Sequence, residues 1–285
     1  DIRSNNIFKL LTKFKPNAIF NLAAETHVDR SIENPKDFLN SNIYGTFNIL
    51  EQIRKYRKKF KKKIKLVHVS TDEVYGDLKN NFRASENSAY HPSSPYSATK
   101  ASADHLVKSY YRTYGIDAVI SNCCNNFGPG QFPEKLLPTL IFNILNNKNL
   151  PLYGKGKNTR EWIHVEDHCR GLFTIYKKGK SGESYNIGSG NNISNLNLTK
   201  LLLKIVKKRK FKIGNNVKIK FVKDRPGHDF RYALNSKKIL KKLKWKSSIN
   251  FESALEQTFN WYLNNYEFFE NFSKKKFFKR IGLKV

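Results

Sequence analysis

Short apolar runs alternate with helical patterns along the first 122 residues. Three runs have the length and composition of β-strands: residues 18–24, 64–70 and 117–122. The first of them, AIFNLAA, is almost continuously apolar, which is typical of a strand covered on both faces. Apolar side chains at helical spacing occupy the neighbouring stretches: residues 4–14, 36–58 and 96–114. This alternation predicts βαβ units and a parallel sheet in an α/β fold.

The character of the sequence changes after residue 124. NNFGPGQFPEK, at residues 125–135, is a loop rich in glycine and proline, and helices and short strands alternate less regularly beyond it. We therefore expect one domain over residues 1–124. A second, smaller α/β domain is expected over residues 125–285, with some of its segments returning to the core of the first.

The chain is strongly basic, with 53 lysines and arginines against 23 aspartates and glutamates and a formal net charge of +30. Nucleic-acid binding is one interpretation. Solvated helix faces are the other, and we favour them because the basic runs are scattered and no nucleic-acid motif accompanies them. We therefore expect no nucleic-acid partner, although this charge should attract anionic ligands such as nucleotide phosphates.

Two further features of the sequence concern membranes and cysteine chemistry. No run of about 18 apolar residues is present, so no membrane span is expected. The three cysteines, Cys123, Cys124 and Cys169, have neither the spacing of a disulfide framework nor that of a zinc site. We interpret them as small apolar side chains of a cytoplasmic protein, and we expect no metal.

Each expected strand ends in polar or small side chains, at residues 23–26, 70–73 and 122–126. The carboxyl ends of parallel strands meet at one edge of a sheet, and ligands of open α/β sheets bind there. In the second strand, VHV changes abruptly to Ser70, Thr71, Asp72 and Glu73. This change predicts that the strand end faces a cleft.

Tyr96 and Lys100 lie four apart in the expected helix 96–114 and therefore share one helix face. A phenol with a pKa of about 10 is a poor base at neutral pH, and a nearby ammonium favours the phenolate. The pair suits a reaction in which a proton leaves an alcohol while a hydride leaves its carbon. A helix-surface pair is the simpler interpretation of this spacing alone, but the Thr71-Asp72-Glu73 strand end upstream favours the catalytic one.

Seven segments, in a consistent order, carry a family resemblance: NLAAETHVDRSIENP, STDEVYG, YSATKASADHLV, NNFGPGQFPEKLLP, PLYGKGKNTREWIHVEDHCRG, YNIGSG and DRPGHDFRYAL. Through them the chain resembles the extended short-chain dehydrogenase/reductase superfamily and, within it, the dTDP-glucose 4,6-dehydratase family. The resemblance implies a Rossmann-type doubly wound sheet whose first strands are missing. It also implies an NAD cofactor and a nucleotide-sugar substrate, dTDP-glucose.

The resemblance implies a role for each catalytic position. Thr71 would hold the 4-hydroxyl of the sugar, Asp72 would protonate the departing 6-hydroxyl, and Glu73 would remove the C5 proton. Tyr96 would be the base at the 4-hydroxyl, and Lys100 would lower the pKa of Tyr96 and bind the nicotinamide ribose. Two adjacent carboxyls with acid and base roles should differ in protonation state. A cap or turn role for Asp72 and Glu73 is the structural alternative.

Two sets of binding residues follow from the same resemblance. Besides Tyr96 and Lys100, the cofactor side comprises Asp1, Ile2, Leu22, Ala23, Ala24, Glu25, Thr26, Ser41 and Asn126. The substrate side comprises Thr26, Thr71, Asn125, Lys135, Leu136, Tyr153, Arg160, Asn195, Asp224, Arg225, Pro226, Gly227 and His228. Asp1 and Ile2 would contact the adenine of the cofactor, and the substrate-side residues from Lys135 onward would hold the nucleotide diphosphate.

The chain departs from the family in one respect. No G-x-G-x-x-G turn follows an expected strand, since GKGKNTRE and GSGNN lie elsewhere. The chain begins with Asp1 and contains no methionine, so we expect a fragment whose cofactor-binding turn precedes Asp1.

Two alternatives stay open. One is another nucleotide-sugar epimerase, dehydratase or decarboxylase, and the other is an inactive fragment or basic binding protein. Helices such as 36–58 and 96–114 pair across a two-fold axis in relatives, so the resemblance also implies a homodimer.

Overall fold

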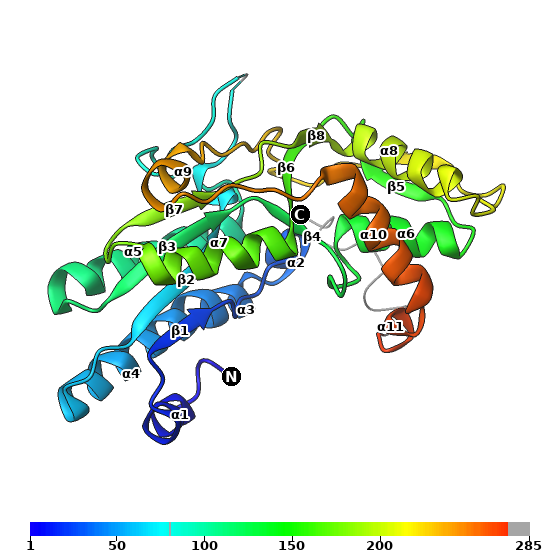
Figure 1. Cartoon of the computed structure of the whole chain (residues 1–285). Coiled ribbons are helices and arrows are strands. Elements are labelled where there is room, and N and C mark those ends of the chain that lie inside the picture. Colours follow the sequence, from blue (N-terminus) through cyan, green and yellow to red (C-terminus); the bar gives the residue numbers. More distant parts are fainter. Residues whose placement is uncertain (80, 273–285) are drawn as a thin grey trace.

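The main sheet has four parallel strands in the spatial order β1-β2-β3-β7 (Figure 1). The structure, a computed structural model, describes residues 1–79 and 81–272. The strands are β1 (Ala18–Asn21), β2 (Lys65–Thr71), β3 (Ala118–Cys123) and β7 (Ser184–Ile187). β7 comes from the second half of the chain, where Ser184 pairs with Ile120 of β3. The predicted α/β class and parallel sheet are confirmed.

Helices cover both faces of this sheet. Leu66 and Ile120 pack in one core cluster with α4 (Gly45–Phe60) and α5 (Pro95–Tyr114). Their strand neighbours Val67 and Val119 pack in another cluster with α7 (Val165–Lys178). Because successive side chains of a strand point to opposite faces, α4 and α5 cover one face and α7 covers the other. Two shorter helices pack outside this layer, α1 (Asn6–Phe14) against α4 and α9 (Lys237–Leu243) against α7.

The helix expected over residues 36–58 is helical but not uniform. After α2 (Val28–Glu33) come α3 (Pro35–Phe38), a π-helical segment at Leu39–Tyr44, and α4. Within the π-helical segment, the buried Asn42 side chain accepts a hydrogen bond from Glu25 N at 2.9 Å and donates one to Thr99 Oγ1 at 2.9 Å. The segment thus fixes the loop after β1 against α5, and such π turns occur frequently at functional sites.

The second half of the chain builds two small sheets. β4 (Asn125–Phe127) pairs with β6 (Thr159–His164), which pairs with β8 (Asn192–Ser194). β5 (Leu150–Tyr153) pairs with β9 (Ile219–Val222). The division into domains at residue 124 stays a prediction, since β7 from the second half completes the main sheet.

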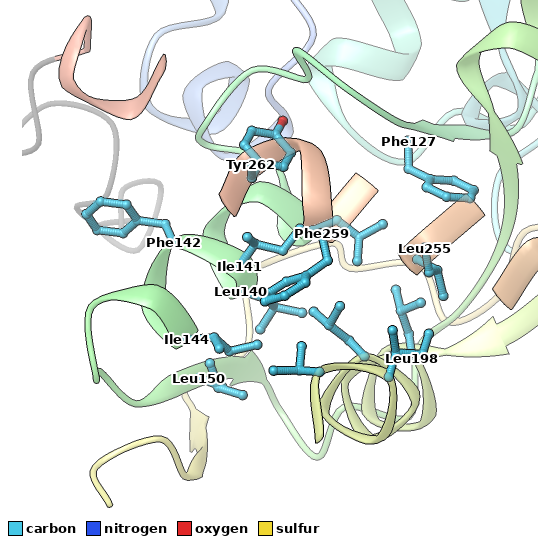
Figure 2. Packing of buried hydrophobic residues seen from close by; sticks show 14 of the residues in the cluster. Phe127, Leu140, Ile141, Phe142, Ile144, Leu150, Leu198, Leu255, Phe259 and Tyr262 are labelled. Atoms are coloured by element: carbon cyan, nitrogen blue, oxygen red, sulfur yellow. The ribbon is translucent and has the colours of Figure 1, made fainter. Parts of the chain in front are cut away.

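A separate hydrophobic core supports these small sheets. It lies among α6 (Leu136–Leu145), α8 (Asn195–Lys208) and α10 (Phe251–Asn264), with α11 (Glu267–Glu270) beside it. Leu140, Leu198 and Phe259 point into this core from the three long helices (Figure 2). All three side chains are fully buried, and burial of each contributes about 1.5–3 kcal/mol. The core therefore holds the loops of the second half in fixed positions.

Among the helices of residues 1–79 and 81–272, none combines the length and apolarity needed to cross a membrane.

Candidate active site

The strand β2 ends at Thr71, whose side chain starts a short 3₁₀ helix at Asp72–Tyr75. The Thr71 hydroxyl accepts a hydrogen bond from Glu73 N at 3.3 Å and donates to Asp72 Oδ1 at 3.3 Å. This cap changes the chain direction at the carboxyl edge of the sheet, so the three adjacent side chains of the Thr-Asp-Glu motif are held together. The strand end that the sequence predicted to face a cleft therefore has a defined local geometry.

Asp72 is 3% exposed. Burial raises the pKa of its carboxyl well above the ordinary value, and the charges of Glu73 and Glu161 raise it further. Within the described part of the chain, its second carboxyl oxygen, Oδ2, has no hydrogen-bond partner. A raised pKa favours the protonated form of the carboxyl, which is the form a general acid needs.

Glu73 has a different electrostatic environment. Burial raises the pKa of this carboxyl also, but the charges of Arg225, Arg160 and Lys135 oppose the rise. The hydroxyl of Tyr232 lies 3.4 Å from Glu73 Oε2, in hydrogen-bonding range of it. Two neighbouring carboxyls thus differ in their surroundings, with cations stabilising the charged form of Glu73.

Tyr96 lies in the first turn of α5, where Pro95 and a capping box of Ser94 and Ser97 fix the helix start. Burial raises the pKa of the buried Tyr96 phenol well above its ordinary value, and the charge of Glu73 adds to this, whereas a hydrogen bond with Thr71 opposes it. Tyr96 therefore lies near the Thr71-Asp72-Glu73 strand end.

Lys100 lies one helical turn further along α5 and is 4% exposed. Its ammonium donates a hydrogen bond to Val69 O of β2 at 2.7 Å. Burial lowers the pKa of Lys100, and the nearby Asp104 carboxylate opposes the decrease. The effect of Lys100 on the pKa of Tyr96, which the resemblance implies, stays a prediction.

A cavity of about 240 Å³ lies beside the strand ends. Ten of the residues that the sequence assigned to the site line it: Thr26, Glu73, Asn125, Lys135, Leu136, Tyr153, Arg160, Asn195, Arg225 and His228. These residues come from both halves of the chain. Three of them are lysine or arginine, so the cavity presents fixed positive charge of the kind that binds phosphate groups.

Two residues of the predicted diphosphate loop, Arg225 and His228, line this cavity. His228 Nδ1 is 2.6 Å from Asp224 Oδ1, and its ring packs edge-on against Tyr153 with centroids 5.9 Å apart. Pro226 and Gly227 complete the turn, with Gly227 at φ +60°. The loop thus presents Arg225 and His228 to the cavity.

Sequence reasoning missed several residues of the site. The cavity is also lined by His27, Asp29, Glu134 and Trp162, all inside the segments that carry the family resemblance. Tyr232 was missed as well, although it lies within the segment DRPGHDFRYAL. The tertiary structure places Tyr232 in the site, because the Arg160 guanidinium stacks over its ring, with Cζ 4.2 Å from the ring centroid.

One part of the set of residues assigned to the cofactor lies around the end of β1. Leu22 is 57% exposed, and Ala23 is exposed next to it, which leaves apolar surface at the sheet edge. The adjacent residues Ala24, Glu25 and Thr26 follow in the same loop, where Asn42 fixes Glu25. Ser41 lies beside Asn42 in the π-helical segment.

Two other parts of the cofactor set lie apart from this loop. Asn126 Oδ1 is buried and has no partner in the described residues, so it can accept a hydrogen bond from a ligand. Ile2 packs against Gly45 at the start of α4, and Asp1 is exposed beside it. Apolar surface and a buried free acceptor fit the nicotinamide side of NAD, whereas the 285 residues contain no glycine-rich turn for its pyrophosphate.

A Rossmann-type sheet with a Thr-Asp-Glu strand end, a Tyr-x-x-x-Lys helix and a cationic cavity defines a class of enzymes that modify nucleotide sugars. The family model described as GDP-mannose 4,6 dehydratase matches residues 1–258. The chain belongs to this family. Among its relatives are the dTDP-glucose 4,6-dehydratase of Shigella flexneri, 47% identical over 280 residues, and dTDP-glucose 4,6-dehydratase 1 of Escherichia coli K12, 46% identical.

Each of these two alignments covers 92% of this chain and 77% of the relative. The crystal structure of a dTDP-glucose 4,6-dehydratase from Streptomyces venezuelae, which has NAD bound, is similar with a TM-score of 0.86 and 40% identity. It covers 95% of this chain and 80% of that one. A UDP-glucose 4-epimerase from Thermotoga maritima has a TM-score of 0.84 at 25% identity, with 94% of this chain and 84% of that one covered. The resemblance inferred from the sequence is confirmed.

Proposed function

We propose that the protein is an NAD-dependent dTDP-glucose 4,6-dehydratase, a lyase. The reaction oxidises C4 of the sugar, eliminates water across C5 and C6, and returns the hydride to C6, which gives dTDP-4-keto-6-deoxyglucose. One observation carries this proposal above the others. Asp72 and Glu73 are adjacent at the end of β2 but differ in environment: the charges of Arg225, Arg160 and Lys135 lower the pKa of Glu73, whereas Arg160 and the hydrogen bond with Thr71 lower that of Asp72.

The chemistry begins at C4. The Thr71 hydroxyl positions the 4-hydroxyl, and Tyr96 takes its proton. NAD, held by the residues around the end of β1, would supply the hydride acceptor for C4 and the hydride donor for C6. Lys100, four residues further along α5, would favour the phenolate through its positive charge. The fixed start of α5 keeps Tyr96 and Lys100 on one helix face toward β2.

Elimination uses the two carboxyls in turn. Once C4 is a ketone, the C5 proton becomes acidic and Glu73 removes it. Asp72 gives its proton to the departing 6-hydroxyl. Elimination needs one carboxyl that donates a proton and one that accepts it: burial raises the pKa of Asp72 well above its ordinary value, and the charges of Arg225, Arg160 and Lys135 oppose the smaller rise at Glu73.

Binding of the nucleotide diphosphate uses the cavity wall. Lys135, Arg160 and Arg225 supply positive charge, and Tyr153 and His228 supply an aromatic surface beside them. Asn195 and Leu136 complete this side, together with the loop from Asp224 to His228. On the cofactor side, Thr26, Ser41, Asn126 and the residues from Leu22 to Glu25 would hold NAD, with Asp1 and Ile2 toward its adenine.

Assembly as a cytoplasmic homodimer belongs to the same proposal. Leu39, Tyr44 and Phe47, on the π-helical segment and α4, are large apolar side chains 38–52% exposed to solvent. A helix surface of this kind suits an isologous two-fold contact. Sedimentation of the purified protein should give the mass of a dimer, and a monomer at all concentrations would exclude it.

A C4-epimerase is the competing function, because epimerases share this fold at 25% identity. The product of the complete gene should be incubated with dTDP-glucose and NAD, and the sugar followed by proton NMR. A new C6 methyl signal without net consumption of NAD is the expected result. Formation of the C4 epimer alone, or no reaction, would overturn the proposal.

A further inference from the structure

Asp29 is a buried carboxylate that none of the roles above uses. It lies in the first turn of α2, on the cofactor-binding half, and is 4% exposed. Its Oδ1 accepts a hydrogen bond from Arg225 Nη1 at 3.1 Å, and its Oδ2 accepts one from the Tyr153 hydroxyl. Arg225 and Tyr153 both come from the second half of the chain. Asp29 therefore joins the two halves at the wall of the cavity that it also lines.

The contact orients the Arg225 guanidinium. The Arg225 side chain is 14% exposed, and Nη1 points to Asp29. Its Nε is buried and has no hydrogen-bond partner among residues 1–79 and 81–272. An arginine presents its donors in a rigid planar fork, so fixing one nitrogen also fixes the direction of the others. Asp29 thus fixes the direction of the guanidinium of Arg225, a residue that lines the cavity.

The same carboxylate fixes the aromatic side of the pocket. The Tyr153 hydroxyl bonds to Asp29, and the Tyr153 ring packs against His228, which in turn contacts Asp224. These contacts fix the side chains of Arg225, Tyr153 and His228, which line the cavity, before any substrate binds. Ordering flexible side chains in advance lowers the entropic cost of binding.

We propose that Asp29 is a positioning residue of the nucleotide site: it holds Arg225 and Tyr153 in the orientation that receives a nucleoside diphosphate. The inference rests on the proposed function, because that function assigns Arg225 and Tyr153 to the diphosphate. Asp29 itself does not touch the substrate phosphates, since its two oxygens are engaged by protein donors and its charge would repel them.

The test is calorimetric binding of dTDP to the product of the complete gene at fixed salt. Asp29→Asn should weaken binding about tenfold, the usual effect of losing a charge-assisted hydrogen bond. In steady-state assays with dTDP-glucose the loss should appear in KM more than in kcat. The matched control is Asp37→Asn, at an exposed aspartate of α3, which should leave binding unchanged.

A double-mutant cycle separates positioning from general damage to the fold. In an Arg225→Gln background, Asp29→Asn should cost much less than in the parent, because the group it orients is gone. Tyr153→Phe gives a second, milder disruption of the same contact and should weaken binding severalfold. A parent that does not bind dTDP breaks the proposed function. A parent that binds while Asp29→Asn binds equally well, or additive losses in the cycle, overturns the inference.

Discussion

The catalytic end of β2 and the nucleotide cavity are assembled in two different ways. Thr71, Asp72 and Glu73 are consecutive, and Tyr96 and Lys100 follow within one helical turn of each other. The cavity wall instead gathers side chains from Thr26 to His228, out of both halves of the chain. Chemistry therefore depends on a local strand end and helix start, whereas nucleotide affinity depends on how the halves pack. Variants of the first region should act on turnover and variants of the second on binding.

The largest expected effect is at the carboxyl pair. Glu73→Gln and Asp72→Asn should each lower turnover by about 100-fold or more, because a positioned proton-transfer group is lost. Proton NMR in D₂O should separate their roles, since Glu73→Gln stops exchange of the C5 hydrogen with solvent and Asp72→Asn retains it. Glu33→Gln, at an exposed glutamate of α2, is the control and should behave as the parent. Exchange at the parent rate in Glu73→Gln would assign the base to another residue.

A smaller effect is expected for Arg160→Lys in the cavity wall. This change keeps the positive charge but loses the fork that donates to Asp229 O at 2.9 Å and the stacking over Tyr232. KM for dTDP-glucose should rise about tenfold, with a smaller decrease in kcat, in steady-state kinetics. Lys157→Arg, at an exposed neighbouring position, should change neither constant. A pure loss of kcat would place Arg160 with the catalytic groups.

Glu73 belongs to the catalytic end of β2 and also lines the cavity. Charges of the cavity wall should therefore affect its pKa and, through it, the pH dependence of turnover. Arg225, Arg160 and Lys135 lower the pKa of this carboxyl and Asp229 raises it, so removing Arg225 should let the pKa rise. Turnover requires ionised Glu73, and it therefore falls as pH decreases through this pKa. The acid limb of the kcat profile should move to higher pH in Arg225→Gln and stay in place in Arg112→Gln, an exposed control on α5. If the acid limb of the kcat profile does not move in Arg225→Gln, the charge of Arg225 does not affect the pKa of Glu73.

The smallest predicted effect concerns stability. The pKa of Asp72 is raised by folding, so its favourable contribution is complete below the unfolded-state pKa and is lost as pH rises through the folded-state pKa. Asp72→Asn should therefore raise the melting temperature by about 2–4 °C at pH 7, with the gain disappearing in acid. Thermal denaturation followed by circular dichroism, at pH 7 and in acid, measures the gain in melting temperature and its disappearance. A lower melting temperature at pH 7 would contradict the burial argument.

The sequence predicted where the local region lies in the fold and part of the lining of the dispersed one, while the roles of the site residues stay predictions. The polar end of β2 and the Tyr96/Lys100 helix face follow from periodicity and from the abrupt change of residue type. The residues of the cavity wall were predicted individually from the family resemblance. Asp29 and Tyr232 escaped because their roles arise from tertiary contacts, such as the one between Asp29 and Arg225, which lie 196 positions apart. The π-helical turn at Leu39–Tyr44 also escaped, since it depends on where Asn42 finds its partners.

The return of β7 to the main sheet affects the order in which the chain can fold. Ile120 of β3 pairs with Ser184, so the open edge of β3 stays uncovered until the intervening segment, with α6, β5, β6 and α7, has been synthesised. Closing so long a loop is slow, and an uncovered strand edge can pair with other chains in the meantime. We therefore expect ribosome-bound chains that stop before residue 184 to engage chaperones, and those that extend past Ile187 to be released from them.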